Sequence, residues 1–87
     1  MNNLHLKIIT PTKTLFNQEI ESVDLPGEKG RFTVLINHGN IISLLTKGKI
    51  NITDLKKETH SFECTKGSVE CLDNNLIVLL EDGELIE

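Results

Sequence analysis

Short runs of alternating apolar and polar residues, separated by turn residues, recur along the whole chain. Segment 4–9 (LHLKII) alternates over its first five residues and is stopped by Thr10-Pro11, and segment 49–53 (KINIT) alternates as cleanly. Alternation with a period of two places successive side chains on opposite faces of an extended strand. No segment of useful length carries an apolar stripe with the period of an α-helix. The pattern therefore predicts a chain built from short strands.

Turn residues mark where these strands begin and end. The strongest signal is segment 26–30 (PGEKG), where proline restricts φ and two glycines permit positive φ. A hairpin is predicted from 14–16 and 19–25, with a β-bulge after Ile20, because Ile20 is out of phase with the next apolar residues of its segment. The remaining predicted strands are 32–36, 41–45, 49–53, 58–63, 68–72 and 76–80.

Size and composition indicate one all-β domain. The chain has 87 residues, with no Trp, no Tyr and three Phe, so its core must be built from Ile, Leu and Val, which favour strands. Short strands at this density are typical of a β-sandwich or barrel. We expect residues 1–87 to form a single domain, and the acidic residues at its end to form a solvated tail: Glu81, Asp82, Glu84 and Glu87.

Segment 41–45 (IISLL) does not fit a strand with only one buried face. Ile42 and Leu44 cannot share a face with Ile41 and Leu45, because successive side chains point to opposite sides. Either the chain itself covers both faces, or one face is an outward apolar patch of the kind that marks a docking surface.

The candidate chemical motifs are unspecific. A thiol activated by imidazole would combine Cys64 or Cys71 with His60 or His38, but any short chain with two Cys and three His offers such pairs. A zinc ligand set could combine His60, Cys64, Cys71 and Glu70, but it lacks the close ligand pairs of structural sites. The glycines match neither phosphate-binding motif. We expect free thiols, no metal, no cofactor and no catalytic residues.

Charge and hydropathy limit the partners. A net charge of −4 and the scarcity of aromatic residues argue against binding to nucleic acid. No segment approaches the about 20 apolar residues of a membrane span, and the first residues lack the features of a signal peptide. The sequence predicts a cytosolic binding or structural module.

Several motifs in a fixed order carry a resemblance that covers nearly the whole chain. They are Leu6-x-Ile8-Ile9-Thr10-Pro11, Leu15-Phe16, Ile20-Glu21-Ser22-Val23-x-Leu25-Pro26-Gly27-x-x-Gly30-x-Phe32, His38, Leu44-Leu45-x-x-Gly48, Gly67-x-x-Glu70, and Asn74-Asn75 before Leu76-Ile77-Val78-Leu79. In this order and spacing the chain resembles the N-terminal domain of the ε subunit of F-type ATP synthases. Gln18, Thr33 and residues 36, 39 and 40 depart from the family pattern, chiefly in turns.

The resemblance implies a flattened sandwich of about ten short strands and no C-terminal helical domain. It implies a non-catalytic rotor subunit that links the γ subunit to the c-ring and couples ion-driven rotation to ATP synthesis. It places the c-ring contact on Glu28, Lys29, Gly30 and Arg31, and the γ contact on Thr10, His38, Ile41, Ile42, Leu44 and Leu45. Because some family members carry an acid at the position of Arg31, we expect the facing c-ring loop to be acidic or neutral.

The resemblance also implies where the protein lies in the cell and that it lacks an inhibitory segment. The protein is expected at the cytoplasmic face of the energy-transducing inner membrane, held there only indirectly through the c-ring. Many family members continue into a helical hairpin that inhibits ATP hydrolysis, and this sequence is expected to lack that arm. A lipoyl or biotinyl carrier or another small ligand-binding sandwich is the alternative, although the chain has neither Met-Lys-Met nor Asp-Lys at a hairpin tip.

Overall fold

The computed structural model describes residues 3–81 and the backbone of 85–86, and these residues form nine strands and no helix. No described segment is a helix long and apolar enough to cross a membrane. The strands are β1 Leu4–Ile9, β2 Thr14–Gly27, β3 Gly30–Leu35, β4 Ile41–Leu45, β5 Gly48–Asp54, β6 Thr59–Cys64, β7 Gly67–Leu72, β8 Asn75–Leu80 and β9 Leu85–Ile86.

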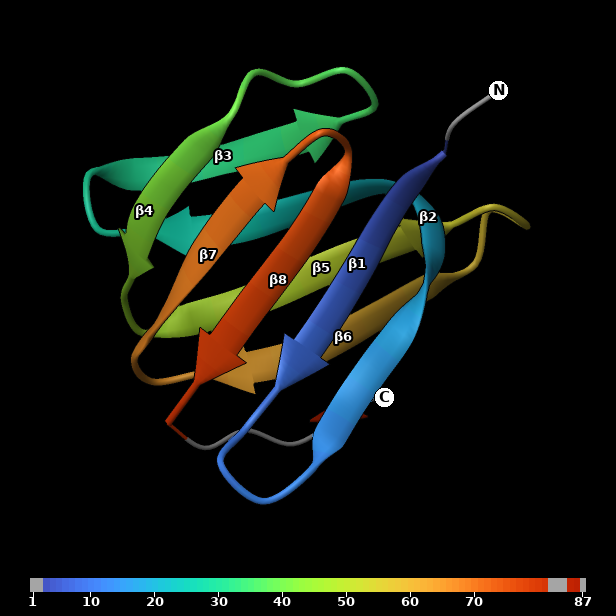
Figure 1. Ribbon diagram of the computed structural model, residues 1–87. Helices are drawn as coiled ribbons and strands as arrows, with labels where there is room; N and C mark the ends of the chain where they lie inside the picture. Colours follow the sequence, from blue (N-terminus) through green and yellow to red (C-terminus); the bar gives the residue numbers. More distant parts are fainter. Residues whose placement is uncertain (1–2, 82–84, 87) are drawn as a thin grey trace.

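The strands form two layers of a β-sandwich (Figure 1). One layer has the order β1-β8-β7-β4, with β1 parallel to β8 and the other neighbours antiparallel. In Figure 1 this layer lies in front of β3, β5 and β6, which cross it at a wide angle. Strand β9 extends the rear layer at the free side of β6. The predicted all-β sandwich is confirmed.

Strand β2 belongs to both layers. Its first half pairs with β1, and its second half pairs with β3 on one side and β5 on the other. The register with β5 shifts between Ile20 and Ser22, which confirms the predicted bulge. The predicted hairpin is wrong, because Asn17 and Gln18 remain paired with β1 and the strand continues without a turn.

The core lies between the layers and is mostly aliphatic. In β1, every second residue is buried, as the alternation predicted. The predicted strands after residue 30 are all present, with bounds that differ by at most two residues. The buried apolar residues are Leu4, Leu6, Ile8, Phe16, Ile20, Val23, Leu25, Val34, Leu45, Ile50, Ile52, Phe62, Cys64, Val69, Cys71, Leu76, Val78 and Leu80.

The chain end contains a strand within the segment expected to be a solvated tail. Leu85 and Ile86 pair with Phe62 and Ser61 of β6, so backbone hydrogen bonds hold this part of the chain against the sandwich. The acidic residues Asp82, Glu84 and Glu87 lie outside the described residues.

The β5–β6 turn is organised by one buried carboxylate. Oδ1 of Asp54 accepts hydrogen bonds from the backbone amides of Lys56 and Glu58 at 2.8 and 3.0 Å, and Oδ2 lies 2.9 Å from Nε2 of His60. The His60 ring stands edge-to-face to Phe16. The hydrogen bond with His60 lowers the pKa of Asp54; burial opposes this effect, and the two backbone amides support it.

Gly67, at the start of β7, should not tolerate a side chain. A Cβ there would overlap the carbonyl oxygen of Leu79 and come within 2.9 Å of Cδ2 of Leu80. We expect Gly67→Ala to lower the free energy of unfolding by about 1–3 kcal/mol, since the backbone of β8 must move. Urea denaturation measures this change. Gly39→Ala is the matched control, because nothing lies near a Cβ at that position, and equal losses in the two variants would contradict the proposed clash.

Acid should destabilise the domain partly through Asp54. Its lowered pKa means that the ionised form stabilises the fold above the unfolded value of about 3.9, and that this stabilisation is lost as the pH falls through the folded value. Over this acid range, we expect the free energy of unfolding of Asp54→Asn to fall less steeply with pH than that of the wild type. Glu63→Gln, which removes an acid from the outer side of β6, should keep the wild-type slope. Identical slopes in Asp54→Asn and the wild type would refute the role of this carboxylate.

Candidate functional site

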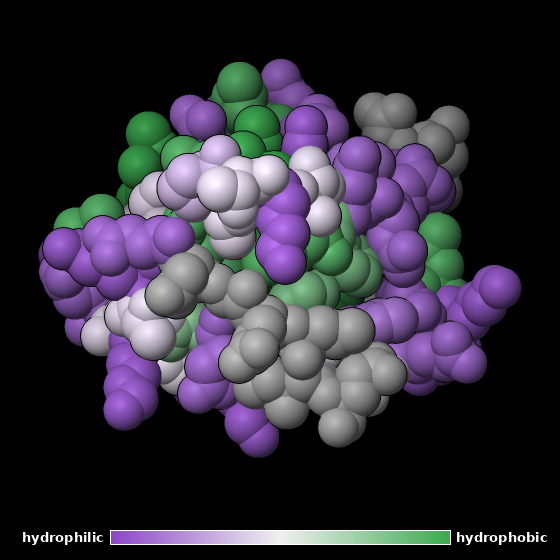
Figure 2. Space-filling view, turned by 90° about the horizontal axis from the view of Figure 1, so that it is seen from below, coloured by the Kyte–Doolittle hydropathy of each residue, from purple (hydrophilic) through white to green (hydrophobic). Residues whose placement is uncertain are grey.

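The outer face of the front layer is rich in exposed apolar side chains. Seen from the end that carries the β1–β2 loop, hydrophobic residues reach the surface along one side of the outline, and hydrophilic residues cover most of the rest (Figure 2). We call the following set the apolar face, with the exposed fraction of each residue: Ile42 79%, Leu44 58%, Leu72 53%, Leu79 49% and Ile77 39%. Several exposed aliphatic side chains on one face mark an interaction site more often than isolated exposed residues do.

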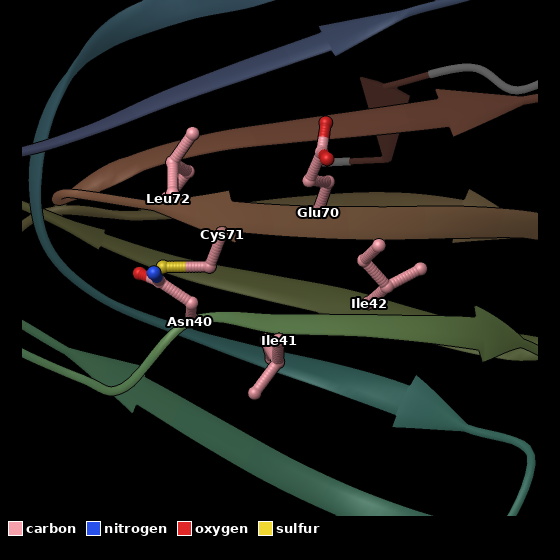
Figure 3. Close-up of a pocket in the computed structure, with 6 residues that line it drawn as sticks. All are labelled: Asn40, Ile41, Ile42, Glu70, Cys71 and Leu72. Atoms are coloured by element: carbon pink, nitrogen blue, oxygen red, sulfur yellow. The ribbon is translucent and has the colours of Figure 1, made fainter.

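Strand β4 shows which of the two alternatives for segment 41–45 holds. Ile42 and Leu44 point to solvent, whereas Leu45 is 3% exposed and Ile41 packs against the core. Figure 3 shows Ile41 and Ile42 projecting to opposite sides of the strand. Among the described residues, none covers the second face of this strand. Leu45 was predicted to contact γ, but its side chain is buried in the core and is not available to a partner.

The sequence-based reasoning missed three members of the apolar face. Ile77 and Leu79 lie on β8, and Leu72 ends β7. Segment 76–80 (LIVLL) carries the same signal as segment 41–45, since all of its residues are apolar and only alternate ones can point into the core. Register brings these residues together: Ile42 and Ile77 both pair with Glu70 of β7, and Leu44 and Leu79 both pair with Ser68.

The outer face of the rear layer is different in character. Thr33, Lys49 and Asn51 are exposed there, and Ser61 and Glu63 are half-buried, while the residues between them face the core. Leu35, at the end of β3, is the apolar exception on these strands. The two faces of the sandwich thus present different chemistry, and the apolar face belongs to the front layer.

A shallow groove of about 370 Å³ crosses the apolar face at the start of β4. Its lining residues are Asn40, Ile41, Ile42, Glu70, Cys71 and Leu72. In Figure 3, Ile42, Glu70 and Leu72 project to the same side of the layer. One carboxylate therefore stands among aliphatic side chains.

The loop before β4 is held by an asparagine clasp, formed by Asn37, Asn40 and Asn74. The backbone amide of Asn37 donates to Oδ1 of Asn74 at 2.6 Å, and Nδ2 of Asn74 donates to Oδ1 of Asn37 at 3.2 Å. Oδ1 of Asn40 accepts from the backbone amide of Asp73 at 3.3 Å. Asn37 and Asn74 both have positive φ, which asparagine tolerates better than most residues. The clasp joins the loop to the β7–β8 turn and so sets Leu72 beside the groove.

The structure separates two of the predicted γ contacts. Thr10 follows β1, and its hydroxyl accepts hydrogen bonds from the amides of Thr12 and Lys13 in the β1–β2 loop. His38 precedes β4, and its Nδ1 lies 2.8 Å from the carbonyl oxygen of Gly39. Strands β1 and β4 run in the same direction within the layer, so Thr10 and His38 lie at opposite ends of it.

The predicted c-ring segment is the β2–β3 hairpin. Glu28 and Lys29 form its exposed two-residue tip, and Gly30 has a φ of 128°. Arg31 is turned away from the tip: its Nε and Nη2 lie 3.1 and 3.0 Å from Oδ2 of Asp24, and Nη2 donates to the carbonyl oxygen of Lys49 at 2.6 Å. The charge of Arg31 is therefore already compensated within the domain. That the facing c-ring loop is acidic or neutral stays a prediction.

The hairpin tip and the apolar face are joined through the backbone. The amide of Glu28 donates to the carbonyl oxygen of Leu44 at 2.9 Å, and the amide of Thr46 donates to the carbonyl oxygen of Pro26 at 2.8 Å. The tip thus adjoins the end of β4 and lies at the same end of the sandwich as Thr10.

The residues considered for thiol chemistry include two buried cysteines and a histidine bound to a carboxylate. Cys64 and Cys71 are buried and form no disulfide, and burial raises the pKa of the Cys71 thiol, which disfavours the thiolate. The His60 ring is bound to Asp54. These contacts favour structural roles for the three side chains.

Comparison with known proteins identifies the fold family. Residues 3–86 match the family described as ATP synthase, Delta/Epsilon chain, beta-sandwich domain. The ATP synthase epsilon chain of Campylobacter concisus is 42% identical over 83 residues, which are 95% of this chain and 64% of that protein. The ATP synthase epsilon chain of Sulfurimonas denitrificans is 42% identical over 86 residues, which are 99% of this chain and 66% of that protein. This chain thus spans about two thirds of the length of these relatives.

Two solved structures share the fold. In the Euglena gracilis mitochondrial ATP synthase, one chain superposes with a TM-score of 0.89 at 13% identity, over 95% of this chain and 53% of that one. In the central stalk and c-ring of the Tetrahymena thermophila mitochondrial ATP synthase, the TM-score is 0.80 at 17% identity, over 95% of this chain and 66% of that one. By the match over residues 3–86, this chain belongs to the family of ATP synthase delta/epsilon chain β-sandwich domains.

Proposed function

We propose that this chain acts in the central stalk of a rotary F-type ATP synthase, where it joins the γ subunit to the c-ring. It couples ion-driven rotation to ATP synthesis and catalyses no reaction itself. The apolar face carries this proposal, because a domain of this family that leaves five large aliphatic side chains uncovered needs a partner surface. The chain would then be held peripherally at the cytoplasmic side of the membrane, through the c-ring alone.

The γ subunit is the proposed partner of the apolar face. Ile42 and Leu44 are its most exposed residues. The face extends across β7 and β8 through Leu72, Ile77 and Leu79. Burying aliphatic side chains against a complementary surface gives the affinity that a permanent rotor contact requires. The rear layer offers no comparable surface among its described residues, which favours attachment through the front layer.

The double variant Ile42→Ser/Leu44→Ser tests this contact. The wild-type chain and the variant would be titrated onto an ATP synthase catalytic complex that contains γ and lacks this subunit, and binding followed by biolayer interferometry. We expect the variant to bind at least about tenfold more weakly, because two central aliphatic contacts are lost. Its thermal unfolding should match that of the wild type, since both side chains are exposed.

Leu55→Ser is the matched control for the double variant. Leu55 is 52% exposed, similar to Leu44, but it lies in the β5–β6 turn, away from the apolar face. It should leave the affinity unchanged. Equal affinities of the wild type and the double variant would show that γ does not dock on this face.

The tip of the β2–β3 hairpin is the proposed contact with the polar loops of the c-ring. Glu28 and Lys29 are exposed there, and none of the described residues forms an ion pair with them. Their charges remain available for the polar c-ring loops, whereas the charge of Arg31 is held by Asp24. The bond from the amide of Glu28 to Leu44 supports a direct link between this contact and the γ contact.

Cysteine cross-linking in the assembled enzyme tests the hairpin contact. Lys29→Cys should cross-link to a cysteine introduced in the polar loop of the c subunit, because the two would lie within disulfide reach. Lys56→Cys, an exposed position in the β5–β6 turn, should not. The native cysteines are buried and should contribute little background. Cross-linking from Lys56→Cys but not from Lys29→Cys would place the c-ring at the other end of the sandwich.

A further inference from the structure

Glu70 occupies the centre of the apolar face. On β7 it lies between Ile42 of β4 and Ile77 of β8, its direct cross-strand partners, and Leu72 follows it on the same side of β7. Its carboxylate projects from the layer together with Ile42 and Leu72 (Figure 3). A single exposed acid is thus surrounded by aliphatic side chains.

The described part of the domain does not compensate this charge. No ion pair involves Glu70 among residues 3–81. The basic residue in its cross-strand row is Lys7, which pairs with Ile77 and stands two strands away, or roughly 10 Å at the usual strand spacing. Lys66, at the neighbouring β6–β7 turn, is directed to Glu81 instead.

Docking would remove the Glu70 carboxylate from water. A charge that becomes buried in an apolar interface without a partner opposes binding strongly, whereas a charge met by an opposite, hydrogen-bonding group fixes the register of the two surfaces. If γ covers the apolar face, its surface must therefore bring a cation to this position.

The groove beside Glu70 indicates which cation fits. Its walls near the carboxylate are the aliphatic side chains of Ile42 and Leu72, and its volume is about 370 Å³. Arginine combines a long aliphatic stem, which packs on such walls, with a planar guanidinium that binds a carboxylate through two parallel hydrogen bonds. It is also enriched among the residues that dominate interface energetics.

We propose that Glu70 is a specificity-determining residue of the apolar face and receives an arginine side chain of the γ subunit. The arginine stem lies in the groove between Ile42 and Leu72, and its guanidinium binds the Glu70 carboxylate. This inference rests on the proposed docking of γ to the apolar face. It adds the chemistry by which that face selects its partner.

Binding of Glu70 variants to the γ-containing catalytic complex tests the proposal. We expect Glu70→Gln to weaken binding about tenfold or more, since a charge-assisted hydrogen-bond pair becomes neutral. Glu70→Lys should bind more weakly still, because like charges then face each other. Raising the salt concentration should weaken the wild type more than Glu70→Gln. Glu63→Gln, on the outer side of the rear layer, should bind like the wild type. Unfolding curves of the two Glu70 variants should coincide with that of the wild type because Glu70 is exposed.

A charge reversal then identifies the partner residue. Each surface arginine and each surface lysine of γ would be changed to Glu in turn and combined with Glu70→Lys, and one arginine variant is expected to regain most of the wild-type affinity. Rescue by reversing a lysine instead would overturn the choice of arginine. Wild-type affinity of Glu70→Gln would refute the inference while leaving γ docking intact. Failure of the wild-type chain to bind the complex at all would instead refute the proposed function.

Discussion

Strand β2 supplies backbone hydrogen bonds to both layers of the sandwich, and β1, β3 and β5 take their positions directly from it. Its first half extends the front layer through β1, and its second half is the centre of the rear layer, between β3 and β5. The bulge after Ile20 makes this possible, because one extra residue bends the strand and restores the inward phase at Val23. A straight β2 would leave the aliphatic residues of one half outside the core.

The sandwich has more aliphatic surface than its interior can hold. Strands β4 and β8 are apolar on both sides, and a domain of two layers has only one interior. Ile41 and Leu45 serve the core, while Ile42 and Leu44 remain outside. Such a face adds nothing to the stability of the isolated chain and favours nonspecific association. An apolar face of this kind is typical of a surface that a partner covers.

The two proposed contacts share the same backbone. The hairpin tip proposed to meet the c-ring is bound through the amide of Glu28 to the carbonyl oxygen of Leu44, next to the side chains proposed to meet γ. A load applied at one contact would reach the other through strand hydrogen bonds rather than through flexible side chains. The core residues between the layers stiffen this path, because close-packed interiors deform little.

The sequence by itself determined the fold class, the positions of nearly all strands, the bulge and the family resemblance. These properties depend on local pattern: alternation selects the inward side chains of β1 and β5, and glycine and proline select the turns. Segment 41–45 has apolar residues at both odd and even positions, which indicated that both faces of this strand need to be covered. Continuity of β2 was not predictable, because Asn17 and Gln18 resemble a turn until their pairing with β1 is known.

Only the tertiary structure decided which face of β4 is exposed and which residues join it there. Inward and outward are properties of the layer that a strand packs on, so Ile42 could be assigned to the surface only after the sheet was assembled. Ile77, Leu79 and Leu72 joined it through cross-strand register, a long-range property. Packing also placed the charged side chains. Arg31 forms an ion pair with Asp24, whereas the Glu70 carboxylate stands among aliphatic side chains. Neither could be predicted, because side chains distant in sequence meet only in the folded sandwich.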